Sequence, residues 1–326
     1  MTRVFSGIQP TGKKHLGNYI GAIRHYVADQ DQGEAFYCVV DLHSISLPYD
    51  PEALAESTLD TAATLLAAGL DPERCTLFAQ SQVDAHPYAA WLLGSVATMG
   101  ELRRMTAFKE KSEGKDSVSA DLFTYPVLQA ADILLYLADR VPVGDDQRQH
   151  LELARDIAQR FNHRYGELFP LPEAAIPSSG GRVMDLQEPT KKMSTTGGTP
   201  QGTVLLDDPP DVVAKKIRSA VTDSGREVRR GDGKEGIANL IEILAIATDR
   251  SADEIEAQYD GAGYGQFKTD VADAVVEWIG PVQERYRELR KDEAALRAIL
   301  DQGAERARTI ADGTLAEMKQ RMGFRL

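Results

Sequence analysis

Short apolar runs alternate with longer stretches of helical spacing along the first half of the chain. The short runs predict strands, and the longer stretches repeat apolar residues three and four positions apart, as amphipathic helices do. We expect strands at 4–8, 36–40, 76–80 and 141–143, and helices at 18–29, 51–68, 85–105, 124–137 and 146–161. Alternation of this kind predicts a parallel sheet covered by helices.

The pattern changes after about Asp185. Residues 188–202 are rich in Pro, Thr, Gly and Lys and predict a loop. From Asp211 onward nearly every segment has helical spacing; a capping-box sequence opens one helix at Ser251, and Gly280-Pro281 predicts a kink in another. The chain is therefore predicted to be an α/β domain followed by a helical one.

Composition excludes several classes of protein. Of the 326 residues, 42% are hydrophobic and 27% charged, which is ordinary globular usage. Lys and Arg number 37 against 50 Asp and Glu, and this net charge of −13 argues against a protein that coats DNA, although a local basic patch is compatible with it. Cys38 and Cys75 form no CxxC pattern, so neither a disulfide framework nor a zinc site is supported. No long apolar stretch indicates a signal peptide or a membrane span, and we expect a soluble, cytoplasmic protein.

The segment from Gly7 to Lys14 nearly matches the phosphate-binding GxxxxGK[ST] pattern of P-loop NTPases. The segment departs from this pattern at positions that bind Mg²⁺ and phosphate. Lys14 stands where Ser or Thr would bind Mg²⁺, and Pro10 removes one backbone N–H from the phosphate cradle. A P-loop NTPase is therefore the less favoured interpretation.

Two other motifs are candidates for binding a nucleotide. His15-Leu16-Gly17-Asn18 follows a predicted strand and opens a helix, where Gly17 leaves room for an adenine ring and His15 and Asn18 can donate hydrogen bonds to phosphate. The basic, glycine-flanked segment 191–198 lies near the predicted domain junction. Neither motif by itself indicates nucleotide binding, since the first can be a simple strand-to-helix turn and the second a solvated linker.

Together these motifs resemble the HIGH and KMSKS signatures of class I aminoacyl-tRNA synthetases. Further segments resemble bacterial tryptophanyl-tRNA synthetases over nearly the whole chain: 4–12, 105–115, 124–126, 130–134, 141–147, 216–224 and 263–265. The resemblance implies a Rossmann-like catalytic domain at 1–186, which includes dimer-forming helices. It also implies a signature loop and a helical tRNA-binding domain at 187–326, whose last helix is able to pack back on the catalytic domain. A homodimer is implied, with the apolar segment 91–105 as its interface.

The activity implied by the resemblance has two steps. L-tryptophan reacts with ATP to give tryptophanyl-adenylate and pyrophosphate, and tryptophan is then transferred to tRNA(Trp). Mg²⁺ is expected mainly on the ATP phosphates, with no dedicated protein metal site. The basic segments 213–230 and 305–326 are candidate contacts for tRNA phosphates. A tyrosine-specific sister synthetase and a tryptophan-binding regulatory paralogue with little activity remain as alternatives.

The spacing of Tyr125, Gln129 and Asp132 places them on one face of a predicted helix. Apolar residues follow Asp132, and a buried carboxylate needs a partner, which can be an indole N–H, an arginine or a turn. The resemblance implies that Asp132 binds the indole nitrogen. It also implies that Tyr125 and Gln147 bind the α-amino group, and that the remaining pocket residues are Gln9, Phe5, Gly7, Gln129, Val141, Val143 and His43.

The resemblance also implies a set of ATP contacts. Lys192, Lys111, His15 and Asn18 are expected to act in catalysis by stabilising phosphate charge, Asp146 to bind the ribose, and Val183 and Met193 to cover the adenine. The other expected contacts are Gln9, Pro10, Thr11, Gly17, Gly144, Asp145, Ser194, Thr195 and Thr196. One departure stands out, because the loop reads KMSTT instead of KMSKS, so Thr195 replaces a lysine. We expect Lys192, with Lys111 or Lys191, to compensate.

Overall fold

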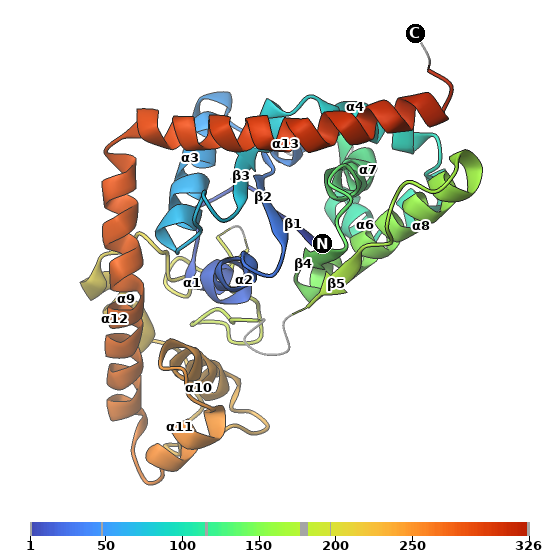
Figure 1. The fold of residues 1–326 in the computed structure, drawn as a ribbon. Helices are drawn as coiled ribbons and strands as arrows, with labels where there is room; N and C mark the ends of the chain where they lie inside the picture. The colour runs from blue at the N-terminus through green and yellow to red at the C-terminus, as the bar shows by residue number, and fades with distance from the viewer. Residues whose placement is uncertain (1, 47, 115–116, 177–181, 196, 325–326) are drawn as a thin grey trace. The chain divides into compact units, whose positions relative to one another are not determined.

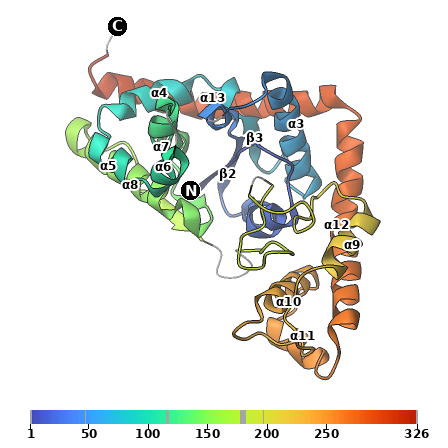
Figure 2. The ribbon, with the colours of Figure 1, turned by 180° about the vertical axis from the view of Figure 1, so that it is seen from behind.

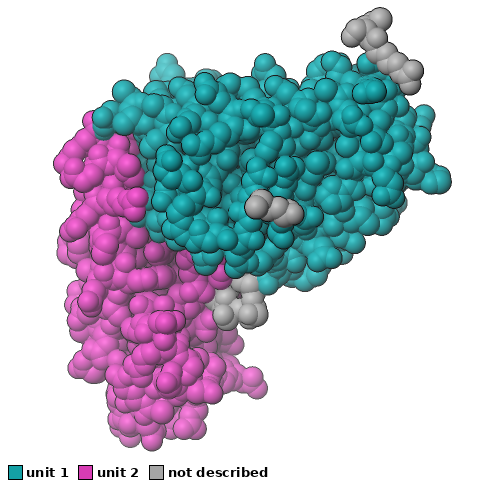
Figure 3. Space-filling model, viewed as in Figure 1, with its two compact units in different colours: residues 1–11, 26–176, 292–326 teal, residues 12–25, 177–291 magenta. Residues whose placement is uncertain are grey.

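The computed structural model describes residues 2–46, 48–114, 117–176, 182–195 and 197–324. The chain forms two compact units, coloured separately in Figure 3. Unit 1 consists of residues 1–11, 26–176 and 292–326, and unit 2 of residues 12–25 and 177–291. Each unit is thus built from segments far apart in the sequence, and the domain boundary expected at residue 186 stays a prediction.

Unit 1 is built on a five-stranded parallel sheet with the strand order β3-β2-β1-β4-β5. Its strands are β1 (Arg3–Ile8), β2 (Glu34–Val39), β3 (Thr76–Ala79), β4 (Arg140–Pro142) and β5 (Glu173–Ala175). From β1, the sheet extends through β2 to β3 on one side and through β4 to β5 on the other. The carboxyl ends of β1 and β4 therefore flank the point where the strand order reverses, which is where open α/β sheets bind ligands. The predicted parallel α/β architecture is confirmed.

Helices cover the sheet of unit 1, and three of them begin at a side-chain cap. They are α3 (Pro51–Ala67), α4 (Ala85–Gly94), α5 (Met99–Arg104), α6 (Thr106–Ser112), α7 (Ala120–Leu134), α8 (Arg148–Tyr165) and α13 (Glu293–Arg321). The single helix expected at 85–105 is wrong, because α4 and α5 are separate helices. Thr98 accepts a hydrogen bond from the Glu101 N–H while the Glu101 carboxylate accepts one from the Thr98 N–H. This capping box starts a new helix.

The last helix, α13, packs against α3, β3 and α4 within unit 1, as Figures 1 and 2 show from opposite sides. Gly303 makes the close approach possible, since a Cβ atom there would lie 1.8 Å from the carbonyl oxygen of Leu77. Arg306 and Arg308 donate hydrogen bonds to the carbonyl oxygens of Pro72 and Gln82. Two of the basic residues expected to contact tRNA therefore also hold this helix in place.

Unit 2 is mostly helical. Its helices are α1 (Leu16–Asn18), the π-helical turn η1 (Tyr19–Ile23), α9 (Pro210–Arg218), α10 (Glu235–Ala247), α11 (Ala252–Gln258) and α12 (Tyr264–Arg290), and α2 (Arg24–Asp29) crosses the unit boundary in the sequence. The capping box of α11 at Ser251 is confirmed. The expectation of near-continuous helix after Asp211 is wrong for residues 219–234, which form a loop because the Asp223 side chain bonds to the Gly225 N–H and the Tyr264 hydroxyl.

Among the described helices, none combines the length and the apolar character that a membrane-spanning segment needs.

Candidate active site

Asp132 is the centre of a buried polar cluster in unit 1. It lies on α7, is 1% exposed, and accepts hydrogen bonds from three side chains. The Nε2 of His43 lies 2.9 Å from Oδ2, and Oδ1 is contacted by the Nε2 of Gln80 and the Nδ1 of His86, each at 2.6 Å. Burial alone would raise the pKa of Asp132, but the hydrogen bonds from His43 and His86 outweigh it and lower the pKa to about 2. The carboxylate is therefore charged at neutral pH.

A second group of residues, which includes the predicted Tyr125 and Lys111, lies next to this cluster. The ring of Tyr125 meets that of His43 edge-on at 6.1 Å, and its hydroxyl lies 2.8 Å from the Nε2 of His150. Burial raises the pKa of Tyr125 to about 12, while burial and then the charge of Lys111 lower the pKa of His150 to about 4. The Lys111 ammonium lies 5.4 Å from the centroid of the Tyr125 ring. Both Tyr125 and His150 are thus neutral near pH 7.

The polar side of this group continues onto the turn after β4. Gln129 of α7 donates to the Gln147 side chain at 3.2 Å, and Gln147 donates to Asp146 at 3.0 Å. Gly144 cannot carry a side chain without moving Asp146, since a Cβ atom would lie 2.6 Å from the Asp146 Oδ1. Asp145 is exposed and accepts a hydrogen bond from Arg148. The carboxyl end of β4 thereby joins the face of α7 that carries Tyr125, Gln129 and Asp132.

The apolar residues expected to form the indole walls lie on β1 and β4. Phe5 is 3% exposed and its ring stacks on Tyr136 at 5.3 Å, and Val141 is buried in the same core. Val143 is half-buried. Gly7 is exposed, and a Cβ atom there would lie 2.8 Å from a methyl group of Val40. Beyond the end of β1, Gln9 and Thr11 are exposed and Pro10 is buried.

In unit 2, the residues of the HLGN motif lie beside the signature loop. The Asn18 side chain accepts a hydrogen bond from the His15 N–H at 3.0 Å. A Cβ atom at Gly17 would lie 3.0 Å from the His15 ring and 3.6 Å from the Cβ of Met193. Burial, followed by the charges of Lys14 and Lys192, lowers the pKa of His15 to about 4. Among the described residues, the buried Nδ1 of His15 has no hydrogen-bond partner.

The Asp185 carboxylate anchors the signature loop, which is the segment 191–198, by hydrogen bonds to the backbone on both sides of it. Asp185 is fully buried and accepts hydrogen bonds from the N–H groups of Gln187, Glu188 and Thr199. Burial would raise the pKa of Asp185, but these hydrogen bonds lower it. The Met193 N–H donates to the carbonyl oxygen of Val183 at 3.0 Å, which brings together the two residues expected to cover adenine. Lys192 is exposed, and Ser194 is half-buried. Thr196 lies outside the described residues.

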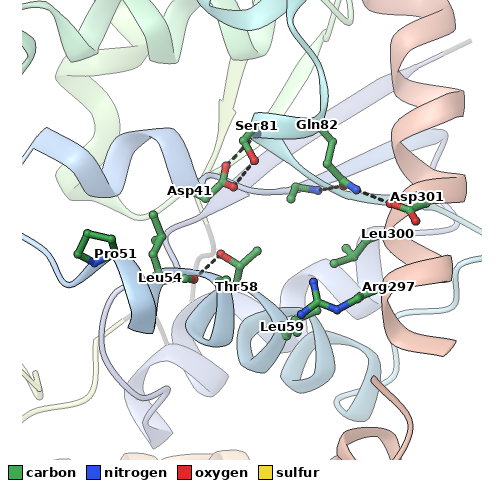
Figure 4. Close-up of a pocket in the computed structure, with 12 residues that line it drawn as sticks. Asp41, Pro51, Leu54, Thr58, Leu59, Ser81, Gln82, Arg297, Leu300 and Asp301 are labelled. Carbon is green, nitrogen blue, oxygen red and sulfur yellow. Dashed lines mark hydrogen bonds between the residues drawn. The ribbon is translucent and has the colours of Figure 1, made fainter. Parts of the chain in front are cut away.

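A hollow of about 470 Å³ lies elsewhere in unit 1, between α3, the carboxyl end of β3 and α13. Figure 4 shows Arg297 and Leu300 projecting from α13 toward α3, with Asp41 and Ser81 on the opposite wall. None of its lining residues is among those expected to bind tryptophan or ATP. Among the residues that the structure describes, no group of three or more His, Cys, Asp or Glu side chains is placed to hold a metal ion.

Sequence reasoning missed several residues that support the site: Gln80, His86, Tyr136, His150 and Asp185. Gln80 follows directly on β3, so the rule that ligand-binding side chains gather at the carboxyl ends of parallel strands could have found it. His86 lies near the start of an apolar helix, where a polar side chain needs a partner. The sequence around Tyr136, His150 and Asp185 carries no comparable signal.

Comparison with known proteins gives a consistent result. A family model described as tRNA synthetases class I (W and Y) matches residues 1–279. The chain is 51% identical to a tryptophan–tRNA ligase of Caldanaerobacter subterraneus subsp. tengcongensis over 99% of both chains. It is similar to the crystal structure of tryptophanyl-tRNA synthetase from Mycoplasma pneumoniae, with a TM-score of 0.92 and 36% identity over 99% of this chain and 98% of that one. It is also similar to the Campylobacter jejuni enzyme complexed with ADP and tryptophan, with a TM-score of 0.84 and 35% identity over 99% and 100% of the two chains.

Proposed function

Because the chain belongs to the class I tRNA synthetases for tryptophan and tyrosine, we propose how its residues carry out the reaction of the tryptophan branch. The activity is ATP-dependent ligation of tryptophan to tRNA, as in relatives that share about half of the sequence over nearly the full length. The observation that carries the assignment of roles is the buried, charged Asp132, whose partners come from α4 and from two short helical turns, η2 (Asp41–Ser46) and η3 (Gln80–Gln82).

Asp132 is proposed to select tryptophan by accepting the indole N–H. A carboxylate offers about four acceptor positions. Within the described part of the chain, Gln80 and His86 use two on Oδ1, and His43 uses one on Oδ2. One position on Oδ2 is therefore left for a donor. A phenylalanine ring has no N–H, so its binding would leave that position unmatched, and an unmatched buried acceptor is costly.

The rest of the amino acid is assigned to neighbouring groups of unit 1. Tyr125 and Gln147 bind the α-amino group, since both supply an oxygen that accepts from an ammonium. Gln9 binds the carboxylate or the α-phosphate. The walls and edge of the indole pocket are Phe5, Gly7, Gln129, Val141, Val143 and His43. The support is two sets of contacts that start from one face of α7. His43 contacts both Asp132 and Tyr125, and Gln147 contacts both Gln129 and Asp146.

ATP, the second substrate, is assigned contacts in each unit. In unit 1, Asp146 binds the ribose hydroxyls, next to Gly144 and Asp145, and Pro10 and Thr11 follow β1 toward the nucleotide. In unit 2, Gly17, Val183 and Met193 contact the adenine, and the phosphates are bound by His15, Asn18, Lys192, Ser194 and Thr195. The contact expected from Thr196 stays a prediction. Lys111, near Tyr125, is assigned to the phosphates as a cation.

The first step needs no protein nucleophile. A carboxylate oxygen of tryptophan forms a bond to the α-phosphorus of ATP, and the bond from that phosphorus to the oxygen bridging to the β-phosphorus breaks. The electron pair leaves with pyrophosphate. The protein contributes by aligning the reactants and by stabilising the charge on the leaving group. Mg²⁺ is proposed to bind mainly the ATP phosphate oxygens.

In the second step, a hydroxyl oxygen of the terminal adenosine of tRNA(Trp) forms a bond to the carbonyl carbon of the adenylate. The bond from that carbon to the phosphate oxygen breaks, AMP leaves with the electron pair, and the hydroxyl proton is released to solvent. We propose a homodimer joined through the region of α4 and α5, where Tyr88, Trp91 and Met99 are exposed, with Trp91 at 84%. Exposed apolar side chains on neighbouring helices are typical of a protein interface. A cytoplasmic location is proposed because the tRNA substrate is used there in protein synthesis.

Amino-acid-dependent exchange of pyrophosphate into ATP tests this function. We expect exchange with tryptophan and very little with tyrosine or phenylalanine. Comparable or faster exchange with tyrosine would identify the tyrosine-specific alternative. Tryptophan binding without exchange above background would identify the regulatory alternative.

A further inference from the structure

The signature loop of this chain has one positive charge fewer than the KMSKS pattern, and a buried lysine lies in the segment that faces it. Thr195 stands where the KMSKS pattern has its second lysine. Negative charge grows on pyrophosphate as it leaves, so a cation there stabilises the transition state more than the bound substrate. A threonine hydroxyl offers only a neutral hydrogen bond, about half as strong as a charged one. Fast activation therefore requires a cation from another position.

The segment that faces Thr195 is 12–16, and its backbone is fixed within unit 2. His15 forms an antiparallel bridge with Leu205, and the Leu206 N–H donates to the carbonyl oxygen of Lys14 at 2.9 Å. Gly12 has a φ of +64°, a backbone conformation that favours glycine. A Cβ atom at Gly12 would lie 2.6 Å from the Oγ1 of Thr195. The hydroxyl that replaces the missing lysine is thus directly against this segment.

Lys14 is the buried lysine. It is only 9% exposed, although lysine is almost never buried in proteins without a reason. Its Nζ lies 3.4 Å from the carbonyl oxygen of Gly12, the residue that meets Thr195. The charges of Lys14 and Lys192 both lower the pKa of His15, so the two ammonium groups act on the same imidazole. Lys14 therefore lies beside Gly12, the residue that meets Thr195, and its charge acts on His15.

We propose that Lys14 contacts the β- and γ-phosphates of ATP and stabilises the departing pyrophosphate, in place of the lysine absent from position 195. This inference rests on the proposed function, because His15, Lys192 and Thr195 mark the phosphate site only if the chain activates an amino acid with ATP. A cation with little exposure to water acts more strongly on a nearby phosphate than an exposed one, since the effective dielectric constant is lower. Lys14, which departs from the P-loop pattern, is thus assigned a contact with the phosphates.

Lys13, Lys191 and Lys111 differ from Lys14 in exposure or in position. The Lys13 side chain is 68% exposed and its Nζ lies 2.6 Å from the Asp207 carboxylate. Lys191 is 61% exposed and forms an ion pair with Glu188. Lys111 belongs to unit 1, where it lies over the ring of Tyr125. The expected substitution by Lys191 is therefore not favoured, and Lys14 is preferred.

The test compares three variants of the full-length protein by single-turnover formation of tryptophanyl-adenylate. Lys14→Met should lower the rate constant about 10²-fold, the loss typical of removing one donor to a developing charge. Lys13→Met is the matched control, because it removes the same charge one residue away, and it should stay within about twofold of wild type. Adding Thr195→Lys to Lys14→Met should raise the rate constant at least about tenfold above that of Lys14→Met alone, because the positive charge returns at the position where the family has it.

A second readout separates contact with pyrophosphate from a purely structural role. In the reverse reaction, Lys14→Met should raise the KM for pyrophosphate while tryptophan affinity stays at the wild-type value. A normal rate for Lys14→Met would overturn the inference, and so would a loss that Thr195→Lys does not recover or an unchanged KM for pyrophosphate. Wild-type protein that forms no adenylate would instead refute the assigned function itself.

Discussion

The Nδ1 of His86 lies 2.6 Å from the Oδ1 of Asp132, and this contact determines which ring nitrogen carries the proton. An ionised carboxylate only accepts hydrogen bonds, so Nδ1 is the donor. On the other side of the ring, the Nε2 of His86 lies 2.9 Å from the hydroxyl of Tyr136. Tyr136, His86 and Asp132 thus form one chain of hydrogen bonds that ends at the proposed indole site.

The first prediction concerns Asp132. Asp132→Ala should lower the preference for tryptophan over phenylalanine by about 10²-fold or more, because the acceptor for the indole N–H is lost. The measurement is pyrophosphate exchange with each amino acid. Asp132→Asn, which preserves the side-chain volume, checks that a loss does not come from a collapsed core. An unchanged preference in both variants would show that Asp132 is a structural residue only.

The second prediction concerns His86 as a positioning residue. Burial favours the protonated form of Asp132, and the hydrogen bond from His86 opposes this, so His86→Ala should raise the pKa of Asp132. Tryptophan binding should then weaken at a higher pH than in wild type, as the carboxylate becomes protonated. Tyr136→Phe is the control, because it leaves the Nδ1 donor and the stack on Phe5 and Phe36 in place. Superimposable pH profiles for all three proteins would contradict this role.

The third prediction concerns stability at acid pH. The pKa values of His15 and His150 are lowered from 6.5 to about 4 in the folded protein. Between these values the unfolded chain binds more protons, so the free energy of unfolding should fall as the pH drops from 6.5 to 4, by up to about 3 kcal/mol for each histidine. His150→Gln should reduce this loss. Urea unfolding across the pH range measures it, and His163→Gln, on the exposed face of α8, should behave as wild type.

The fourth prediction concerns the base of the signature loop. A Cβ atom at Gly202 would lie 1.7 Å from the Oδ1 of Asp185, so Gly202→Ala forces this carboxylate away from the backbone it holds. We expect a loss of about 1–3 kcal/mol in the free energy of unfolding of the unit, together with slower adenylate formation, because Lys192 is on the displaced loop. Gly197→Ala is the matched control, since no described atom lies within 4 Å of its Cβ position. Equal stability and rate for the two variants would refute the role of Asp185.

Much of the fold could be predicted from the sequence because its signals are local. A strand such as β1 is marked by a few consecutive apolar residues, and the capping box at Ser251 needs only four residues. The same holds for the motifs at 15–18 and 192–194, whose chemistry is contained in short segments. Local signals overlooked in the sequence were also present, since Thr98 and Glu101 have the spacing of the capping box that separates α5 from α4.

The sequence alone therefore determined the α/β class, the position of the candidate nucleotide-binding motifs and the shared helix face of Tyr125, Gln129 and Asp132. Only the tertiary structure decided what surrounds Asp132. Its partners come from positions 43, 80 and 86, which are 46 to 89 residues away along the chain. The parallel sheet brings the carboxyl ends of β2 and β3 to one edge. A buried carboxylate needs hydrogen-bond donors, and the fold determines which residues supply them. The closeness of Gly12, which contacts the Lys14 ammonium, to Thr195 has the same origin. It joins segments about 180 residues apart in the sequence, and neither segment carries a local signal of the pairing.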